Sequence, residues 1–309
     1  MKKLIPIISV VLILAVAAYM LLFKQNSPIT KSVAQEEMVL NLKEFNKVPS
    51  CARLPMFLYR AGVTRPIIDL SQEKYTGIAF YTQKGTIHKK EWERFEYLGT
   101  YTINPSGDIY LTPNPFISIK PTTFNLQKGI YKLDSNSGNL TRWMVIDEVK
   151  ASPTNPYGLI SITYDCKDNT LWASAIDKSD YKGSKGRIYH INPKTKDIIE
   201  KIENFDALTI TILKAKDKRY LLAGNARDNS LYAFVFNNNK ISKTPYKLLT
   251  LPTPNLHIRK IKVADKNTLI LEAIKFKYSL VAETNKKQRY IFIAKHNPDN
   301  NSWSIKEQK

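Results

Sequence analysis

The chain has 309 residues, of which 47 are lysine or arginine and 27 are aspartate or glutamate, so its formal net charge is +20. Its hydrophobic fraction of 43% is that of a folded protein and too high for a disordered one. Two cysteines exclude a disulfide-framework miniprotein and a cysteine-rich zinc module, and four scattered histidines leave little material for a histidine cluster.

The N-terminus combines two lysines with an uncharged stretch of 20 residues, 4–23. At a rise of ~1.5 Å per residue, a helix of this length spans ~30 Å, the thickness of the hydrocarbon core of a bilayer. Lys2 and Lys3 predict a cytoplasmic N-terminus, because positive flanking charge stays inside. We therefore expect a transmembrane signal-anchor at residues 1–23, a tether at 24–41, and a folded domain at 42–309 on the periplasmic or extracellular side.

Cleavage of this segment as a secretory signal is the alternative, and it would release the folded domain as a secreted protein. Residues 15–17, Ala-Val-Ala, have the small-x-small form of a cleavage site. The apolar run continues past this site to residue 23, which favours a retained anchor. In both cases the rest of the chain is expected to cross the membrane.

Strand-like segments follow the tether, beginning with apolar runs at residues 56–59, 66–70 and 77–81. From residue 97 onward, the chain repeats a unit of four predicted strands whose turns are rich in Asn, Asp, Pro, Gly and Lys. The last two strands of each unit form a predicted hairpin. The hairpins begin at Gly129, Gly186, Leu231 and Tyr290, and the first two strands of the units are residues 97–103 with 108–112, 159–164 with 170–175, 208–213 with 219–223, and 258–263 with 268–273.

Four-stranded antiparallel units that recur every ~40–50 residues are typical of the blades of a β-propeller. The four units and a further blade from residues 49–90 predict five blades, or six if one blade is degenerate. An open β-sandwich is the rival fold, but it would not require the hairpin to recur with the same turn chemistry. The expected fold class is therefore all-β: a five-bladed, alternatively six-bladed, β-propeller of four-stranded antiparallel blades after one N-terminal transmembrane helix.

One unit carries a family pattern. Residues 156–165 read as an inner strand with a glycine, 169–174 as Asn-Thr-Leu-Trp-Ala-Ser, and 186–195 as a Gly-Arg-Ile-Tyr-His-Ile-Asn-Pro-Lys-Thr hairpin. This unit resembles a blade of the NHL/SMP-30-like propeller superfamily, and residues 97–146 and 208–305 resemble it loosely. The resemblance implies architecture, because lactonases, sugar dehydrogenases and binding scaffolds share these motifs. The Glu-Gly-Pro motif that supplies a metal ligand in calcium-dependent lactonases is absent, so that ligand set does not carry over.

Propellers bind ligands at a central funnel, where the loops before the inner strands converge. Carboxylate and amide oxygens from different blades could hold Ca²⁺ there. The alternative is that each Asn and Asp caps a turn, in which case no cofactor is expected. The funnel candidates by position are Asp69, Asn155, Tyr157, Asp206, Asn255, His257 and Arg259.

Cys51 and Cys166 are an even pair in a chain predicted to be exported. A disulfide between them would tie the N-terminal blade to a turn of the third blade and stabilise the fold by ~4–5 kcal/mol on the chain-entropy model. The alternative is two separate small residues, with Cys166 in the turn at 165–169. The absence of a Cys-x-x-Cys motif gives no indication of redox catalysis.

Two insertions fall at the same place in their units, between the second and third strands. They are the proline-rich residues 113–127 and residues 181–185, and they are expected to emerge on one face of the ring. Long loops of this kind often carry recognition. The excess of positive charge could steer anionic partners such as lipid head groups or acidic glycans, or could be a solvated lysine-rich surface.

These observations favour a membrane-tethered extracytoplasmic β-propeller that binds a protein or a glycan through its loop face over an enzyme, and they leave enzymatic activity open. No nucleic-acid partner is expected for an exported domain. The alternative function is a Ca²⁺-dependent, lactonase- or esterase-like hydrolase with its site in the funnel. A serine-hydrolase elbow, a P-loop and a Gly-x-Gly-x-x-Gly motif are absent, which disfavours enzymes of those types.

Overall fold

The computed structural model describes residues 40–71, 73–95, 97–115, 124–238, 240–279 and 288–308. These residues belong to one unit, Val39–Lys309. The predicted anchor at 1–23 and the tether, except for its last two residues, lie outside the described residues. Within the described ranges, every helix is too short or too polar to cross a membrane.

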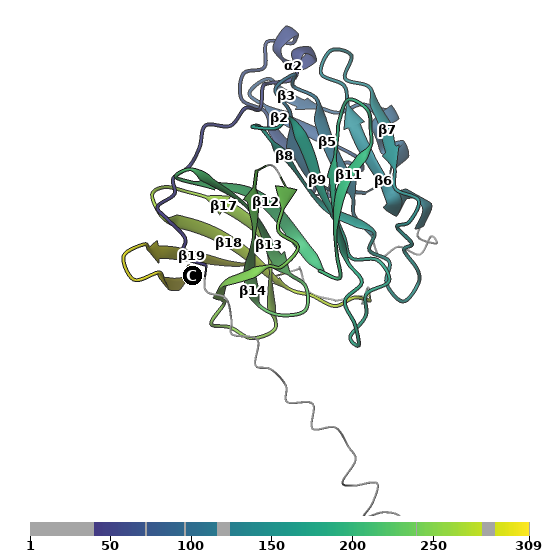
Figure 1. The fold of residues 1–309 in the computed structure, drawn as a ribbon. Coiled ribbons are helices and arrows are strands. Elements are labelled where there is room, and N and C mark those ends of the chain that lie inside the picture. The colour runs from purple at the N-terminus through teal and green to yellow at the C-terminus, as the bar shows by residue number, and fades with distance from the viewer. Residues whose placement is uncertain are drawn as a thin grey trace, which may run out of the picture. The chain divides into compact units, whose positions relative to one another are not determined.

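Five antiparallel sheets make up the described chain, and we call them blades 1 to 5 in chain order (Figure 1). Sequential strands pair in each of them, except that in blade 4 the last two strands both pair with the third. Blade 1 contains β1 (Ile67–Asp69), β2 (Ala79–Thr82) and β3 (Gly85–Ile87); blade 2 contains β4 (Leu98–Ile103), β5 (Ile109–Pro113), β6 (Gly129–Leu133) and β7 (Leu140–Val145). Blade 3 contains β8 (Leu159–Asp165), β9 (Thr170–Ala175), β10 (Arg187–Ile191) and β11 (Ile198–Glu203).

Blades 4 and 5 complete the set. Blade 4 contains β12 (Ala207–Ala215), β13 (Lys218–Asn225) and β14 (Ser230–Asn237), with β15 (Lys240–Ile241) and β16 (Tyr246–Thr250) both paired to β14. Blade 5 contains β17 (Leu256–Val263), β18 (Thr268–Lys275), β19 (Tyr290–Asn297) and β20 (Ser302–Gln308). The first strands contact one another from blade to blade, β4 with β8, β8 with β12 and β12 with β17. The chain is therefore a five-bladed β-propeller, as the repeat predicts.

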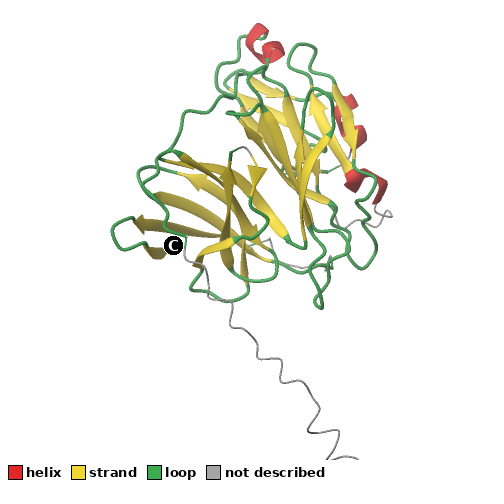
Figure 2. Ribbon diagram, viewed as in Figure 1, coloured by secondary structure: helices red, strands yellow, loops and turns green. Residues whose placement is uncertain are grey.

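Helical segments are few in the described chain (Figure 2). They are α2 (Met56–Arg60) and two 3₁₀ turns, η1 (Lys90–Phe95) and η2 (Phe124–Lys128). The predicted strand at 56–59 is wrong, because this segment forms α2. Pro55 begins the helix, and its carbonyl accepts the N–H groups of Leu58 at 3.1 Å and Tyr59 at 3.0 Å. A four-residue apolar run cannot distinguish a strand from one helical turn by periodicity, and blade 1 consequently has three strands instead of four.

Apolar layers fill the spaces between successive blades. Because side chains alternate across a strand, a central strand supplies both of its neighbours. In β9, Leu171 and Ala173 pack toward blade 2, whereas Trp172 packs toward blade 4. Every residue of β9 and β10 is therefore buried. Among the described residues, apolar clusters join blades 1 and 2, 2 and 3, 3 and 4, and 4 and 5, but none joins blade 5 to blade 1.

Residues 40–55, which we call the strap, cross the turns between the first and second strands of four blades. The strap begins on the β17–β18 turn, where the Phe45 N–H donates to Asn267 Oδ1 at 2.9 Å and the Asn267 N–H donates to the Phe45 carbonyl at 2.9 Å. Phe45 also forms an antiparallel bridge with Ala215 at the end of β12. The start of the strap therefore ties blade 5 to blade 4.

The second half of the strap contacts blades 3 and 2. Cys51 is disulfide-bonded to Cys166 in the β8–β9 turn, so the two cysteines pair as the sequence allowed. The Arg53 N–H then donates to the Asn104 carbonyl in the β4–β5 turn at 3.4 Å. We call the end of the ring that carries these turns the strap face. The opposite end, with the connections between second and third strands and between blades, is the loop face.

Candidate binding site on the loop face

A register irregularity near the start of each of three first strands leaves one residue outside the ladder: Ile160 in β8, Leu208 in β12 and Arg259 in β17. From this position, the Arg259 guanidinium group donates hydrogen bonds to the backbone carbonyls of the two equivalent residues, Leu208 and Ile160. Its Nη1 donates to the Leu208 carbonyl at 3.0 Å and its Nη2 to the Ile160 carbonyl at 3.4 Å. Thr100 Oγ1 of β4 also donates to the Ile160 carbonyl, at 3.2 Å. These hydrogen bonds connect the first strands of four blades at the funnel mouth. Burial lowers the pKa of Arg259.

Apolar and aromatic side chains fill the funnel mouth above these hydrogen bonds. The Phe276 ring lies 5.2 Å from the Tyr157 ring, 5.2 Å from the Tyr278 ring and 6.0 Å from the His257 ring. Tyr157 and Phe276 pack against one buried cluster. That cluster consists of Ile160, Ile176, Leu208, Ala226 and Tyr278. The described side chains at the mouth are therefore mainly apolar and aromatic.

Asp206 organises the loops around the mouth from a buried position. Its Oδ1 accepts the Ser179 hydroxyl at 2.6 Å and the Gly186 N–H at 2.8 Å, and its Oδ2 accepts the Tyr278 hydroxyl at 2.5 Å. Burial, followed by the bond to Asp206, raises the pKa of Tyr278. A Cβ at Gly186 would lie 2.4 Å from Asp206 Oδ1, so only glycine allows this approach. With these donors and Arg227 at 3.9 Å, the carboxylate positions Tyr278 and the β9–β10 loop.

Two further sequence candidates also hold loops in place. Asn155 Oδ1 accepts the Tyr157 N–H at 3.1 Å, which is a turn-capping bond, and its Nδ2 donates to the carbonyls of Ile176 at 2.7 Å and Ser179 at 2.8 Å in the next loop. His257 Nδ1 lies 3.1 Å from the Asp228 carbonyl and therefore donates to it. Burial lowers the pKa of His257, which favours the neutral ring.

Asp69 and Asn255 take no part in this cluster within the described chain. Asp69 ends β1, where its carboxylate accepts the Ser71 N–H at 2.9 Å and the Tyr81 hydroxyl at 3.2 Å. Asn255 is exposed and has a φ of 62°, typical of a turn residue. In the described ranges, three or more His, Cys, Asp or Glu side chains nowhere gather in a group that could hold a metal.

The sequence reasoning missed the two aromatic residues that close the mouth, Phe276 and Tyr278. They follow β18 directly, and a strand pattern of alternating aromatics extended past Lys275 could have found them. Both predicted insertions do lie between second and third strands, residues 113–127 between β5 and β6 and residues 181–185 between β9 and β10. Both insertions therefore lie on the loop face. Residues 116–123 of the first insertion lie outside the described residues.

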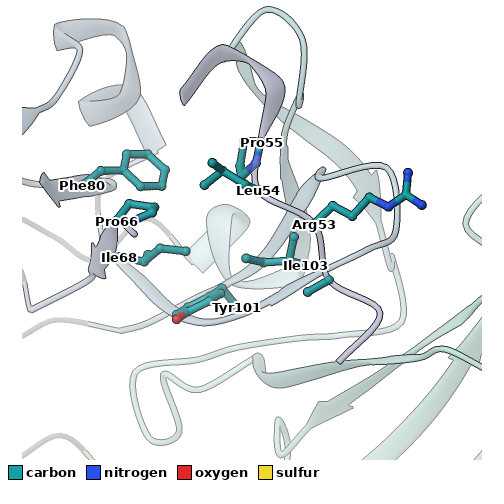
Figure 3. A pocket seen from close by; sticks show the side chains of 9 residues that line it. Arg53, Leu54, Pro55, Pro66, Ile68, Phe80, Tyr101 and Ile103 are labelled. Carbon is teal, nitrogen blue, oxygen red and sulfur yellow. The ribbon is translucent and has the colours of Figure 1, made fainter. Parts of the chain in front are cut away.

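A separate pocket of about 240 Å³ lies between the strap, blade 1 and β4 (Figure 3). Ile68, Tyr101 and Ile103 point toward one another across it, whereas the guanidinium group of Arg53 extends away from the apolar side chains. The lining residues are Ala52, Arg53, Leu54, Pro55, Pro66, Ile68, Phe80, Tyr101 and Ile103.

No family model and no curated protein matches this chain. Solved structures resemble it at low identity. Hydrazine synthase from Kuenenia stuttgartiensis aligns with 78% of this chain and 62% of its own, at 8% identity and a TM-score of 0.41. The acylaminoacyl peptidase from Pyrococcus horikoshii aligns with 73% and 35%, at 13% identity and 0.35.

A third similar structure, dihydro-heme d1 dehydrogenase NirN, aligns with 76% of this chain and 42% of its own, at 10% identity and a TM-score of 0.39. The chain thus spans less than two thirds of the length of each of these structures. Likenesses at these scores carry no functional argument. The resemblance to the NHL/SMP-30-like superfamily therefore rests on the sequence motifs alone.

Proposed function

We propose that the chain is a membrane-tethered, extracytoplasmic binding protein whose loop face recognises an acidic glycan. The uncharged run at 4–23, after Lys2 and Lys3, supports the tether. The pairing of Cys51 with Cys166 is in keeping with an oxidising compartment.

The proposal depends most on Tyr181, at the tip of the β9–β10 loop. Its side chain is 68% exposed, yet its ring contacts the Tyr278 ring edge-on at 5.7 Å. Arg227 holds the same tip, because its Nη1 donates to the Asp180 carbonyl at 2.7 Å and its Nη2 to the Tyr181 carbonyl at 3.2 Å. An exposed aromatic ring with a fixed backbone can stack on a sugar ring without a large ordering cost.

Charge around this ring favours an anionic ligand. Lys178, Lys182 and Lys185 belong to the same loop and are exposed. The Asp180 carboxylate instead accepts the backbone N–H groups of Lys182 at 2.8 Å and Gly183 at 2.9 Å, and these bonds lower its pKa. The tip of the loop thus exposes three lysines against one carboxylate.

Few large apolar side chains are exposed in the described part of the loop face. Among the described residues of the loops between second and third strands, Tyr181 is the one large apolar side chain that is strongly exposed. Stable protein interfaces bury ~800 Å² on each partner and have an apolar centre. A single ring flanked by lysines fits a sugar with carboxylate groups better.

Binding of the full chain in zwitterionic nanodiscs to three immobilised polymers tests this proposal. Polygalacturonate carries sugar rings and charge, dextran carries rings alone, and polyglutamate carries charge alone. We expect binding to polygalacturonate that Tyr181→Ala weakens about tenfold, and no effect of Tyr59→Ala, whose side chain is 65% exposed on α2. Equal binding to dextran or polyglutamate, or an unchanged affinity of the Tyr181→Ala protein, would refute the proposal.

A further inference from the structure

In the part of the chain that the structure describes, blade 1 lacks the strand that lines the axis in the other blades. Blades 2, 3 and 5 have four strands in meander order, whereas the described strands of blade 1 are β1, β2 and β3. The segment before β1 that could have supplied one more strand, Met56–Arg60, forms the helix α2 instead. β1 therefore forms one edge of its sheet.

The direction of β1 identifies the missing strand as the first. The Phe57 N–H of α2 donates to the Ser135 carbonyl in the β6–β7 turn at 2.8 Å, and Lys84 Nζ of the β2–β3 turn donates to the Ala61 carbonyl at 3.4 Å. Both turns belong to the strap face, so β2 runs toward the strap face. Because β1 is antiparallel to β2, β1 runs from the strap face toward the loop face. In the complete blades this is the direction of the second strand, and its axial neighbour is absent in blade 1.

The pocket lies against the face of β1 that carries Ile68, because its lining includes both Ile68 and the ladder partner Phe80 of β2. Ile68 of β1 and Tyr101 of β4 face each other across it (Figure 3). Tyr101 is 42% exposed, and Ile67 is 68% exposed on the other side of β1, opposite Tyr81 in the ladder. Both faces of the edge strand thus offer apolar contacts to whatever pairs with it.

The charged side chains at the pocket indicate which residues should flank a bound segment. Arg53 lines the pocket, and Arg65 precedes Pro66 at its rim. Both arginines are exposed, and neither forms an ion pair with a described residue. The nearby carboxylate of Asp69 accepts bonds from Ser71 and Tyr81. The described charges at and near the pocket, two arginines and one carboxylate, therefore sum to a net positive charge.

We propose that this pocket is a strand-addition site for an extended peptide segment of a partner protein. The segment pairs with the free edge of β1, places alternate apolar side chains in the pocket, and carries acidic residues at its flanks. It would complete blade 1 as the first strand does in the other blades. Backbone bonds to a sheet edge give affinity in this mode of recognition, and pockets for alternate side chains give specificity. The site is independent of the loop face.

The test uses synthetic eight-residue peptides and the full chain in zwitterionic nanodiscs. The first peptide alternates valine with threonine and ends in glutamates. The second has proline in place of a central threonine, and the third has lysines in place of the glutamates. Dissociation constants come from fluorescence anisotropy, and amide hydrogen exchange reports protection of residues 67–69. The variants are Tyr101→Lys, Arg53→Glu combined with Arg65→Glu, and the matched control Tyr59→Lys.

We expect the acidic peptide to bind and to protect the β1 amides, and the proline peptide to bind at least tenfold more weakly. Tyr101→Lys should weaken binding at least tenfold while Tyr59→Lys leaves it unchanged. The double arginine variant should prefer the lysine peptide. Equal binding of the proline peptide, no preference for acidic flanks, or no binding by a folded protein at millimolar peptide would each overturn the proposal.

Discussion

Removal of the disulfide by the double substitution Cys51→Ala and Cys166→Ala should destabilise the propeller strongly. The bond joins residues 115 positions apart. On the chain-entropy model, a closed loop of this length stabilises the folded state by ~5 kcal/mol at 25 °C. For a domain of this size, ~1 kcal/mol corresponds to ~2 °C in Tm, so the expected loss is about 10 °C.

The double variant should nevertheless fold, because other contacts keep the strap in place. The paired bonds between Phe45 and Asn267 lie on one side of Cys51, and the bond from Phe57 to Ser135 lies on the other. Thermal and guanidinium unfolding followed by circular dichroism, with and without dithiothreitol, measures the effect. The reductant should lower the Tm of the native chain and leave that of the double variant unchanged.

The result that would refute this reasoning is a double variant as stable as the oxidised native chain. Such an outcome would mean that the strap is already restrained in the unfolded state, or that the disulfide distorts the turn at Cys166 by as much as it constrains the chain. Single variants, which leave one free thiol, would not distinguish these cases.

Two further substitutions test the funnel mouth. Arg259→Met removes the charged donors to the carbonyls of Ile160 and Leu208, so it should lower the free energy of unfolding by about 2–4 kcal/mol in urea titrations. Arg259→Lys should lower it by less than half as much. Equal effects of the two substitutions would contradict the role of Arg259 in connecting the blades. Burial lowers the pKa of His257 below the ~6.5 of an unfolded chain, so protonation favours unfolding and stability should fall as pH drops below ~6.5. His257→Gln should reduce the change in urea midpoint between pH 7.5 and 5.5, and a midpoint that rises on acidification would refute this assignment.

The sequence predicted the repeated blades well because their information is local. Turn residues such as Asn192 and Asn104 fix each hairpin through bonds to the backbone N–H groups that follow. Blade 1 was predicted less well, since a short apolar run after a proline satisfies a strand or a helical turn equally. Only the packing of Leu58 under blade 1 decides for the helix.

The funnel was partly predictable. Position in the repeat brings Tyr157, His257 and Arg259 to the mouth, but it says nothing of what they contact. Arg259 occupies the same place in its blade as Ile160 and Leu208, and a cation where sister copies carry aliphatic side chains is a sign that alignment of the units could detect. The pairing of Cys51 with Cys166 depends on the path of the strap, which no local pattern encodes.

The path of the strap also sets an order of events during synthesis. Its first residues bond to partners 222 and 261 positions later, since Phe45 meets Asn267 and Leu40 meets Asn301. The first residues of the strap, which are synthesised before the blades, therefore form these bonds only after blade 5 has been synthesised. At ~5–20 residues per second, that delay is on the order of ten seconds or more. Cys166 follows Cys51 by 115 residues, so the two cysteines can meet before blade 5 has been synthesised.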